Sequence, residues 1–382
     1  MAKETSVYAR LSQILENEGV FQSILNNVDE KYNNEDWKLF SNVQPMQLSR
    51  QWNTILDNAE IAVMASTMGE NDPTPMRALQ GFEKQNGSIP VIGHGFKFGI
   101  RDVQEMRDIN MAEDVMLPRL YQKFFDRTSV SIQGFHHRLN YWIDQTLNSG
   151  AMVVDATNSP DGVPFSITYD IPAENYQVAK GSAATARWTN NTANSTADPI
   201  ADIRRWMDIM KKRGVLNPVM VMTENTYLML ILHPAVIQQL ANLNKFSSVS
   251  GIANINRDEL WTAIRTAFGL PNILVLDHKY KVEKDGVPTD LASPLEDNKI
   301  AMLDINNAFN VYQAHQTLLD QHGANISTAT AENGMIAVLR DSGDRAIETT
   351  VEMQAYVAPV LNEPKKLLIA DVSKNSANGQ LQ

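Results

Sequence analysis

The longest amphipathic pattern in the chain lies between residues 117 and 149. Apolar side chains recur there at helical spacing and fall on one face of a helix: Leu120, Phe124, Ile132, Phe135, Leu139, Ile143 and Leu147. Gly150 follows, and glycine readily takes the left-handed conformation that closes helices. The pattern predicts one helix of roughly 50 Å at about 1.5 Å per residue, with Gly134 as a weak point or kink.

A helix–strand–helix–helix module is predicted between residues 198 and 240. Asp198 is a good N-cap, and Gly214 follows a basic last turn, so the first helix runs between them. The short apolar run 219–222 predicts a buried strand. Thr223 can cap a second helix, which His233-Pro234 ends before a further helical turn through 240.

Strands alternate with one more helix in the remainder of the chain. The helix is predicted over 257–268, ending at Gly269, and Asp285-Gly286 predicts a hairpin turn. The predicted strands cover 152–154, 167–169, 272–276, 299–304, 335–340, 347–361 and 366–372.

Residues 61–101 have the composition of a long hairpin, rich in glycine, proline and asparagine. Asn86-Gly87 is its best tight turn. A soluble hairpin on its own would expose many apolar side chains, so we expect these to contact another subunit: Met76, Leu79, Phe82, Ile89, Val91 and Ile92. The first sixty residues contain helically spaced apolar positions, and they form either an interaction arm or a small helical cap on the chain's own core.

Composition indicates a large folded protein. The chain has 382 residues, of which 43% are hydrophobic, and it contains no cysteine, so disulfides and thiolate metal sites are excluded. We find no apolar run long enough for a membrane span and no secretory signal pattern, and we therefore expect a cytosolic origin and no membrane partner.

The formal net charge of −11 opposes tight non-specific binding of duplex DNA, because such binding depends on cations that neutralise phosphates. Arg119, Lys123 and Arg127 nevertheless form a basic stripe at four-residue steps on the predicted long helix. The stripe could face DNA, pair with acids of an adjacent subunit, or remain an ordinary solvated face.

Candidate catalytic and metal residues all have simpler structural explanations. His136 and His137 point about 100° apart on a helix and do not chelate together. Asp198 and Asp202 are explained as residues at a helix start, and 93–99 lacks the ending of a phosphate-binding loop. We predict a protein that is not an enzyme, with no catalytic, cofactor-binding or metal site.

Three segments of the 198–240 module, namely 197–202, 214–222 and 234–240, resemble the axial domain of lambda E-type tailed-phage major capsid proteins. The strand 347–361, followed by a proline-containing return and 366–372, is similar to the closing pattern of that family. The resemblance covers about residues 61–372 and is strongest from 196 onward.

The resemblance implies an α+β, Hong Kong 97-like capsid fold with an N-terminal arm, extended β-hairpin loop, long spine helix, peripheral domain and axial domain. It assigns 1–60 to the arm, 61–101 to the loop, 102–196 to the peripheral domain with spine helix and β-strands, 197–334 to the axial domain, and 335–382 to C-terminal strands returning to the peripheral domain. In the family the loop overlaps a neighbour, so deletion of residues 74–92 is expected to leave a folded subunit that does not assemble.

The implied function is a major capsid protein that self-assembles through pentamers and hexamers into the icosahedral head around the double-stranded DNA of a tailed bacteriophage. Its implied partners are itself, portal and scaffold or decoration proteins, and packaged DNA held by weak non-specific contact. It would be assembled in the host cytoplasm and end in the virion capsid. The alternatives are an encapsulin-like cellular nanocompartment shell and a soluble α/β enzyme with a ligand cleft.

Overall fold

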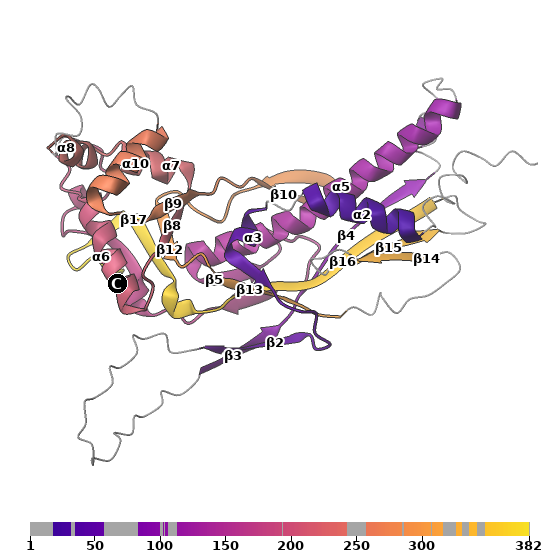
Figure 1. Ribbon diagram of the computed structural model, residues 1–382, viewed down its shortest axis with the longest axis horizontal. Coiled ribbons are helices and arrows are strands. Elements are labelled where there is room, and N and C mark those ends of the chain that lie inside the picture. Colours follow the sequence, from indigo (N-terminus) through magenta and orange to yellow (C-terminus); the bar gives the residue numbers. More distant parts are fainter. Residues whose placement is uncertain are drawn as a thin grey trace, which may run out of the picture. The chain divides into compact units, whose positions relative to one another are not determined.

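The structure is a computed structural model that describes residues 18–31, 35–56, 83–99, 102, 104–105, 113–192, 194–242, 257–284, 286–306, 308–315, 326–330, 336–341 and 348–381. The chain divides into two compact units (Figure 1). Unit 1 comprises Met1–Asn53, Asn86–Asn140 and Phe309–Val360, and unit 2 comprises Thr54–Gln85, Tyr141–Ala308 and Leu361–Gln382.

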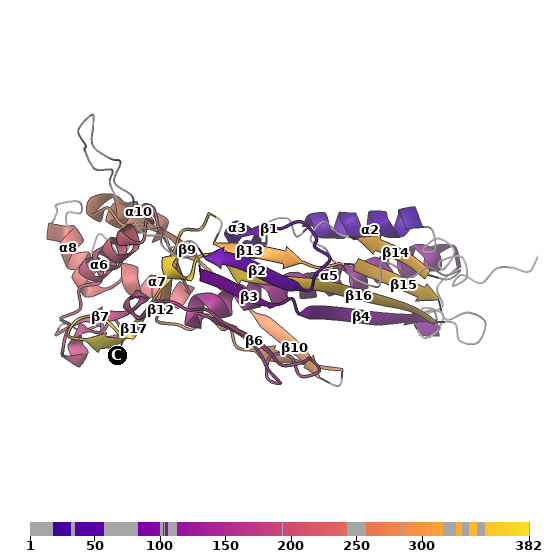
Figure 2. The same ribbon diagram turned by 90° about the horizontal axis from the view of Figure 1, so that it is seen from below.

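Unit 1 is built on a six-stranded sheet with β16 (Glu348–Leu361) near its centre (Figure 2). The strand order is β1 (Ser41–Val43), β13 (Phe309–Gln313), β16, β15 (Ile336–Asp341) and β14 (Ile326–Thr330), and β4 (Val91–Gly99) also pairs with β16. Val351, Met353 and Ala355 are buried on β16, as strand alternation predicts, and the residues from 356 to 361 are all buried.

The long helix α5 (Glu113–Ser149) confirms the predicted amphipathic helix and begins four residues earlier than predicted. Its 37 residues span roughly 55 Å, and Gly150 ends it with φ +73°. The helix assignment continues through Gly134, and a Cβ at this position would lie 3.1 Å from Nδ1 of His94. The glycine therefore serves a close approach between α5 and β4.

Two shorter helices complete the described part of unit 1. Helix α2 (Glu18–Lys31) lies against β14, and α3 (Asp36–Phe40) buries Trp37 and Phe40. The backbone N–H of Trp37 donates to the Asn140 side-chain oxygen at 2.8 Å, and its indole Nε1 donates to Nδ1 of His136 at 3.0 Å. The segment before β1 is thus held on α5 by buried hydrogen bonds.

A separate two-stranded ribbon is formed by β2 (Gln51–Leu56) and β3 (Glu83–Ser88). The predicted turn at Asn86-Gly87 is wrong, because both residues lie inside β3, and Ile89-Pro90 separates β3 from β4. Gly87 is required here for space: a Cβ would lie 2.7 Å from the indole of Trp52.

Unit 2 contains a five-stranded sheet whose order is β7 (Tyr176–Lys180), β17 (Leu368–Ser376), β12 (Lys299–Leu303), β8 (Val219–Met222) and β9 (Asn272–Val275). β12 runs antiparallel to β17 and β8, whereas the two outer pairs are parallel. The helices packed with this sheet are α6 (Pro199–Lys212), α7 (Glu224–Ile231), α8 (Pro234–Asn242) and α10 (Arg257–Phe268). Ile203, Trp206 and Met220 are fully buried in the shared core.

The helix ends of unit 2 follow the local signals in the sequence. Asp198 caps α6 by accepting from the backbone N–H of Ala201, and Thr223 caps α7. Gly214 and Gly269 have φ +81° and +65°, which confirms them as helix stops.

Two small ribbons and three short 3₁₀ turns complete unit 2. The ribbons pair β5 (Ala151–Val154) with β6 (Phe165–Thr168) and β10 (Tyr280–Lys284) with β11 (Val287–Leu291). The turns are η1 (Ala173–Asn175), η2 (Ala184–Ala186) and η5 (Pro364–Lys366).

The predicted domain borders stay a prediction, and the two compact units divide the chain at other positions. Residues 141–196 belong to unit 2, although they were expected with the spine helix in the peripheral domain. The predicted C-terminal block 335–382 is divided, since β16 pairs with β4 in unit 1 and β17 pairs with β7 and β12 in unit 2.

Candidate functional site

The predicted contact residues of the hairpin have different environments. Ile89 is only 4% exposed, and its backbone N–H donates to the carbonyl of Arg50 at 2.7 Å, so it is a core residue. Val91 is 50% exposed at the start of β4, and Ile92 beside it is half-buried. Met76, Leu79 and Phe82 lie outside the described residues. Among the described members, Val91 is the exposed apolar side chain.

A second apolar surface surrounds β1 and was not identified from the sequence. We name it the β1 strip; it consists of Leu39, Val43, Met46 and Leu48, which are 52%, 44%, 41% and 90% exposed. β1 is an edge strand of its sheet, and edge strands have backbone N–H and C=O groups that can pair with a further strand. The signal in the sequence is five apolar residues within ten positions, these four and the buried Phe40, and their spacing fits neither a helix nor a strand throughout.

The basic stripe on α5 is largely neutralised by the chain itself. The carboxylate of Asp102, whose side chain is 8% exposed, lies 2.8 Å from Lys123 Nζ and 2.8 Å from Arg127 Nη2. Glu105 lies 2.9 Å from Lys123, and Arg127 also donates to the carbonyl of Lys97 at 3.0 Å. Arg119 is exposed. The structure therefore brings together two of the three predicted cations around an acid that sequence reasoning missed.

The ion pairs change the titration of Lys123. Burial by itself lowers the pKa of the ammonium, but hydrogen bonds to Asp102 and Glu105 outweigh it, so that the pKa is raised. Lys123 accordingly stays charged and held by its acidic partners.

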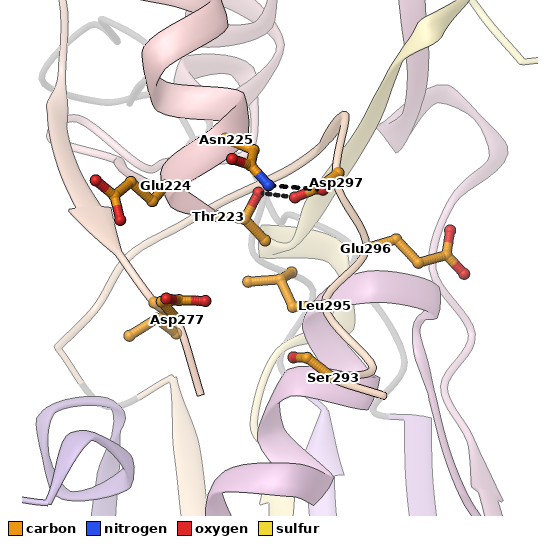
Figure 3. A pocket seen from close by; sticks show the side chains of 9 residues that line it. Thr223, Glu224, Asn225, Asp277, Ser293, Leu295, Glu296 and Asp297 are labelled. Atoms are coloured by element: carbon orange, nitrogen blue, oxygen red, sulfur yellow. Dashed lines mark hydrogen bonds between the residues drawn. The ribbon is translucent and has the colours of Figure 1, made fainter. Parts of the chain in front are cut away.

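A polar cleft of about 310 Å³ opens in unit 2 beside the start of α7 (Figure 3). Thr223 and Asn225 point toward Asp297 and donate to its carboxylate at 2.6 and 3.0 Å (Figure 3). Two further acids of the lining are paired with cations, Glu224 with Arg257 at 2.8 Å and Glu296 with Lys299 at 3.0 Å. These carboxylates stabilise the chain around them, so the cleft does not favour the enzyme alternative.

A buried acid near the end of α5 anchors the β10–β11 ribbon. Asp144 is 1% exposed, accepts from the hydroxyl of Tyr280 at 2.7 Å and lies 2.8 Å from Nδ1 of His278. Tyr280 also packs edge-on against Tyr141, with ring centroids 5.0 Å apart. The strands beyond this base are mostly exposed, and Val287 is 61% exposed.

The histidines take part in separate structural contacts. His136 accepts from Trp37, His278 pairs with Asp144, and Nδ1 of His233 accepts from the backbone N–H of Ala235. Within the described ranges no group of three or more histidine, aspartate or glutamate side chains is arranged to hold a metal ion. None of the helices that the structure describes is long and apolar enough to span a bilayer.

Comparison with known proteins gives the family. A family model described as phage major capsid protein E matches residues 54–372. The chain belongs to the phage major capsid protein E family. It is thus a structural capsid protein, and its self-association into capsid oligomers and its place in the virion capsid follow from that family. No curated protein matches the sequence.

A solved structure supports the capsid fold. A protein assigned as the capsid protein of a prophage of E. coli CFT073 is similar with a TM-score of 0.56 and 14% identity, over 93% of this chain and 98% of that one. The capsid of cyanophage A-1(L) also matches, with 14% identity over 88% and 92% of the two chains, at a TM-score of 0.44. The predicted Hong Kong 97-like α+β capsid class is therefore confirmed, and the family is that of phage capsids rather than of cellular compartment shells.

Proposed function

We propose that this capsid protein E family member is the repeating subunit of a tailed-phage head, and that pentamers and hexamers of it close into an icosahedral shell around double-stranded DNA. The match to the family model over residues 54–372 carries the proposal, and the prophage capsid neighbour supports it. The role is architectural, without catalysis, and assembly takes place in the host cytoplasm.

The exposed apolar surfaces of unit 1 are the proposed contacts between copies. The β1 strip and Val91 expose large apolar side chains, which soluble proteins usually cover when they form clusters. In a closed symmetric shell each such contact is repeated in every subunit, so modest patches add up to a stable assembly. The predicted contribution of Met76, Leu79 and Phe82 belongs to the same proposal.

Packaged DNA is proposed to be contained rather than tightly bound. The chain carries a net charge of −11, and Asp102 pairs with two of the three cations of the basic stripe. Few cations are then available to neutralise phosphates, which limits non-specific affinity. Arg119 remains the exposed member of the stripe and the candidate for weak inner-face contact. Portal and scaffold or decoration proteins are the other proposed partners.

Expression of the chain alone and together with its neighbouring genes tests this function. We expect shells, tubes or capsomers by sedimentation and negative-stain electron microscopy, and DNA inside particles formed in the presence of the packaging genes. Leu48→Glu should reduce shell yield, whereas Val163→Glu, at an 83% exposed position of unit 2, serves as the matched control. A stable monomer or dimer under every condition would overturn the proposal.

A further inference from the structure

The β2–β3 ribbon depends on its base for a defined direction. It pairs only within itself among the described strands, and an isolated two-stranded ribbon is marginally stable in water. Its base lies in unit 1, where Arg50, Trp52, Gly87 and Ile89 are close together in the structure. The contacts of these four residues therefore decide how firmly the ribbon is held.

Residues at the beginning of β2 are bound to two strands of the six-stranded sheet. The indole of Trp52 is fully buried and stacks on Tyr312 of β13, with ring centroids 6.1 Å apart and an interplanar angle of 25°. The guanidinium of Arg50 lies 4.3 Å from the ring centroid of Tyr356 of β16 and donates to its hydroxyl at 2.9 Å. Both contacts hold β2 on the sheet.

Gly87 lets the backbone of β3 lie directly against the indole of Trp52. A Cβ at this position would lie 2.7, 2.8 and 2.9 Å from Cζ2, Cε2 and Nε1 of Trp52, distances that real Cβ atoms essentially never show. The indole thus packs directly on the glycine backbone, and any side chain at 87 must push the two apart. Nε1 of Trp52 has no hydrogen-bond acceptor among the described residues, so the ring is held by packing against Tyr312 and Gly87 and not by a hydrogen bond.

We propose that Trp52 and Gly87 are a positioning pair, in which the indole packed on the glycine sets the direction in which the β2–β3 ribbon leaves unit 1. The inference rests on the proposed function, in which this ribbon carries the intervening residues toward a second copy of the chain. The two strands of the ribbon have six residues each, so a few degrees of tilt at the base displace their far ends more than the base itself, and the pair acts on assembly more than on folding.

Gly87→Ala tests the pair, with Gly93→Ala as a matched control. A Cβ at Gly93, on β4, would meet its nearest atom at an ordinary 3.7 Å, so the control makes the same chemical change without the clash. We expect Gly87→Ala to fold, and the yield of shells per folded subunit to fall by about tenfold, the factor that 1.4 kcal/mol produces. Gly93→Ala should assemble like the parent.

A compensating substitution separates positioning from general damage. Phenylalanine can still stack on Tyr312 but lacks the outer six-membered ring of the indole, including Cζ2, the atom that a Cβ at 87 would approach most closely. Trp52→Phe combined with Gly87→Ala should therefore restore shell yield. Normal shells from Gly87→Ala alone, or no recovery in the double variant, would overturn the inference. If Gly87→Ala alone does not fold, the comparison is between Trp52→Phe and the double variant Trp52→Phe/Gly87→Ala. These two should give the same shell yield, and a lower yield from the double variant would also overturn the inference.

A shortened ribbon distinguishes this inference from the proposed function. Deletion of residues 74–92 is unsuitable, because it removes β3 and the first two residues of β4, which pair with β16. Replacing residues 58–81 by a glycine–serine link keeps both strands and the base. Normal shells from that variant would show that the ribbon is not needed between copies. Failure of that variant together with normal assembly of Gly87→Ala would remove the positioning role alone.

Discussion

The indole Nε1 of Trp188 donates a hydrogen bond of 3.0 Å to the carboxylate of Asp202 inside unit 2. Asp202 is 3% exposed and also accepts from the backbone N–H of Lys180 and from Arg205. The Trp188 ring stacks on Trp206 with centroids 5.4 Å apart. An acid of the first turn of α6 thus connects that helix to β7 and to the loop that carries Trp188.

Asp202→Ala should lower the free energy of unfolding by about 3 kcal/mol, because it removes the acceptor of Trp188 Nε1 and of the Lys180 N–H and the carboxylate that pairs with Arg205. Chemical denaturation of the unassembled subunit measures this. Asp208→Ala on the same helix is the control, because the Asp208 side chain is 71% exposed and its ion pair with Lys211 is long at 3.6 Å. Equal unfolding midpoints for the two variants would contradict the structural role of Asp202.

His233 should make stability depend on pH. Burial lowers its pKa, with partial compensation by Asp198. The pKa of His233 in the folded state lies below its value in the unfolded state. The stability that depends on neutral His233 is therefore fully present above about pH 6.5, and it is lost as the pH falls through the folded pKa.

His233→Asn should therefore flatten the loss of unfolding free energy between about pH 7 and pH 5, because asparagine can cap α8 without titrating. Urea unfolding at several pH values measures the slope, and His94→Asn, at an exposed position, should retain it. An unchanged slope in His233→Asn would be contrary evidence.

The ion pairs among Asp102, Glu105, Lys123 and Arg127 should make the stability of the subunit depend on salt concentration. Asp102→Asn removes the buried partner of Lys123 and Arg127, and we expect a loss of about 1–2 kcal/mol at low salt that shrinks at high salt. Glu105→Gln, which removes an acid 68% exposed from the same lysine, should change stability by less than about 0.5 kcal/mol. Similar effects from both substitutions would argue against the buried acid as the centre of the cluster.

Tyr280→Phe should loosen the β10–β11 ribbon. The variant loses the hydrogen bond to the carboxylate of buried Asp144, and a hydrogen bond to a charged group contributes about 1.5–3 kcal/mol. Hydrogen exchange of the ribbon amides should accelerate, while α6 amides remain protected. Thr289→Val removes an exposed hydrogen bond of the same ribbon and should have little effect. Unchanged exchange in Tyr280→Phe would show that the ribbon does not depend on this anchor.

Elements with local signals were predictable from the sequence. Asp198, Thr223, Gly150 and Gly214 mark helix ends because a cap or a left-handed glycine acts within a few residues, and the structure has each of them in that role. The match to the family model confirmed the resemblance of the 197–240 module to capsid proteins. That resemblance could be read from the sequence because it rests on the order of elements within one short segment. The β1 strip was missed, because exposure at a sheet edge depends on which strands pair.

The sequence by itself thus determined the long helix α5, the helices α6, α7, α8 and α10, eight of the described strands and the capsid family of this protein, since periodicity and capping depend on near neighbours. Tertiary structure alone decided that Gly87 receives the Trp52 ring instead of forming a turn, and that Asp102 neutralises Lys123 and Arg127. It also decided that Asp144 meets Tyr280 from 136 residues away. Such roles arise when packing brings distant segments within a few ångströms, and no pattern along the chain encodes that distance.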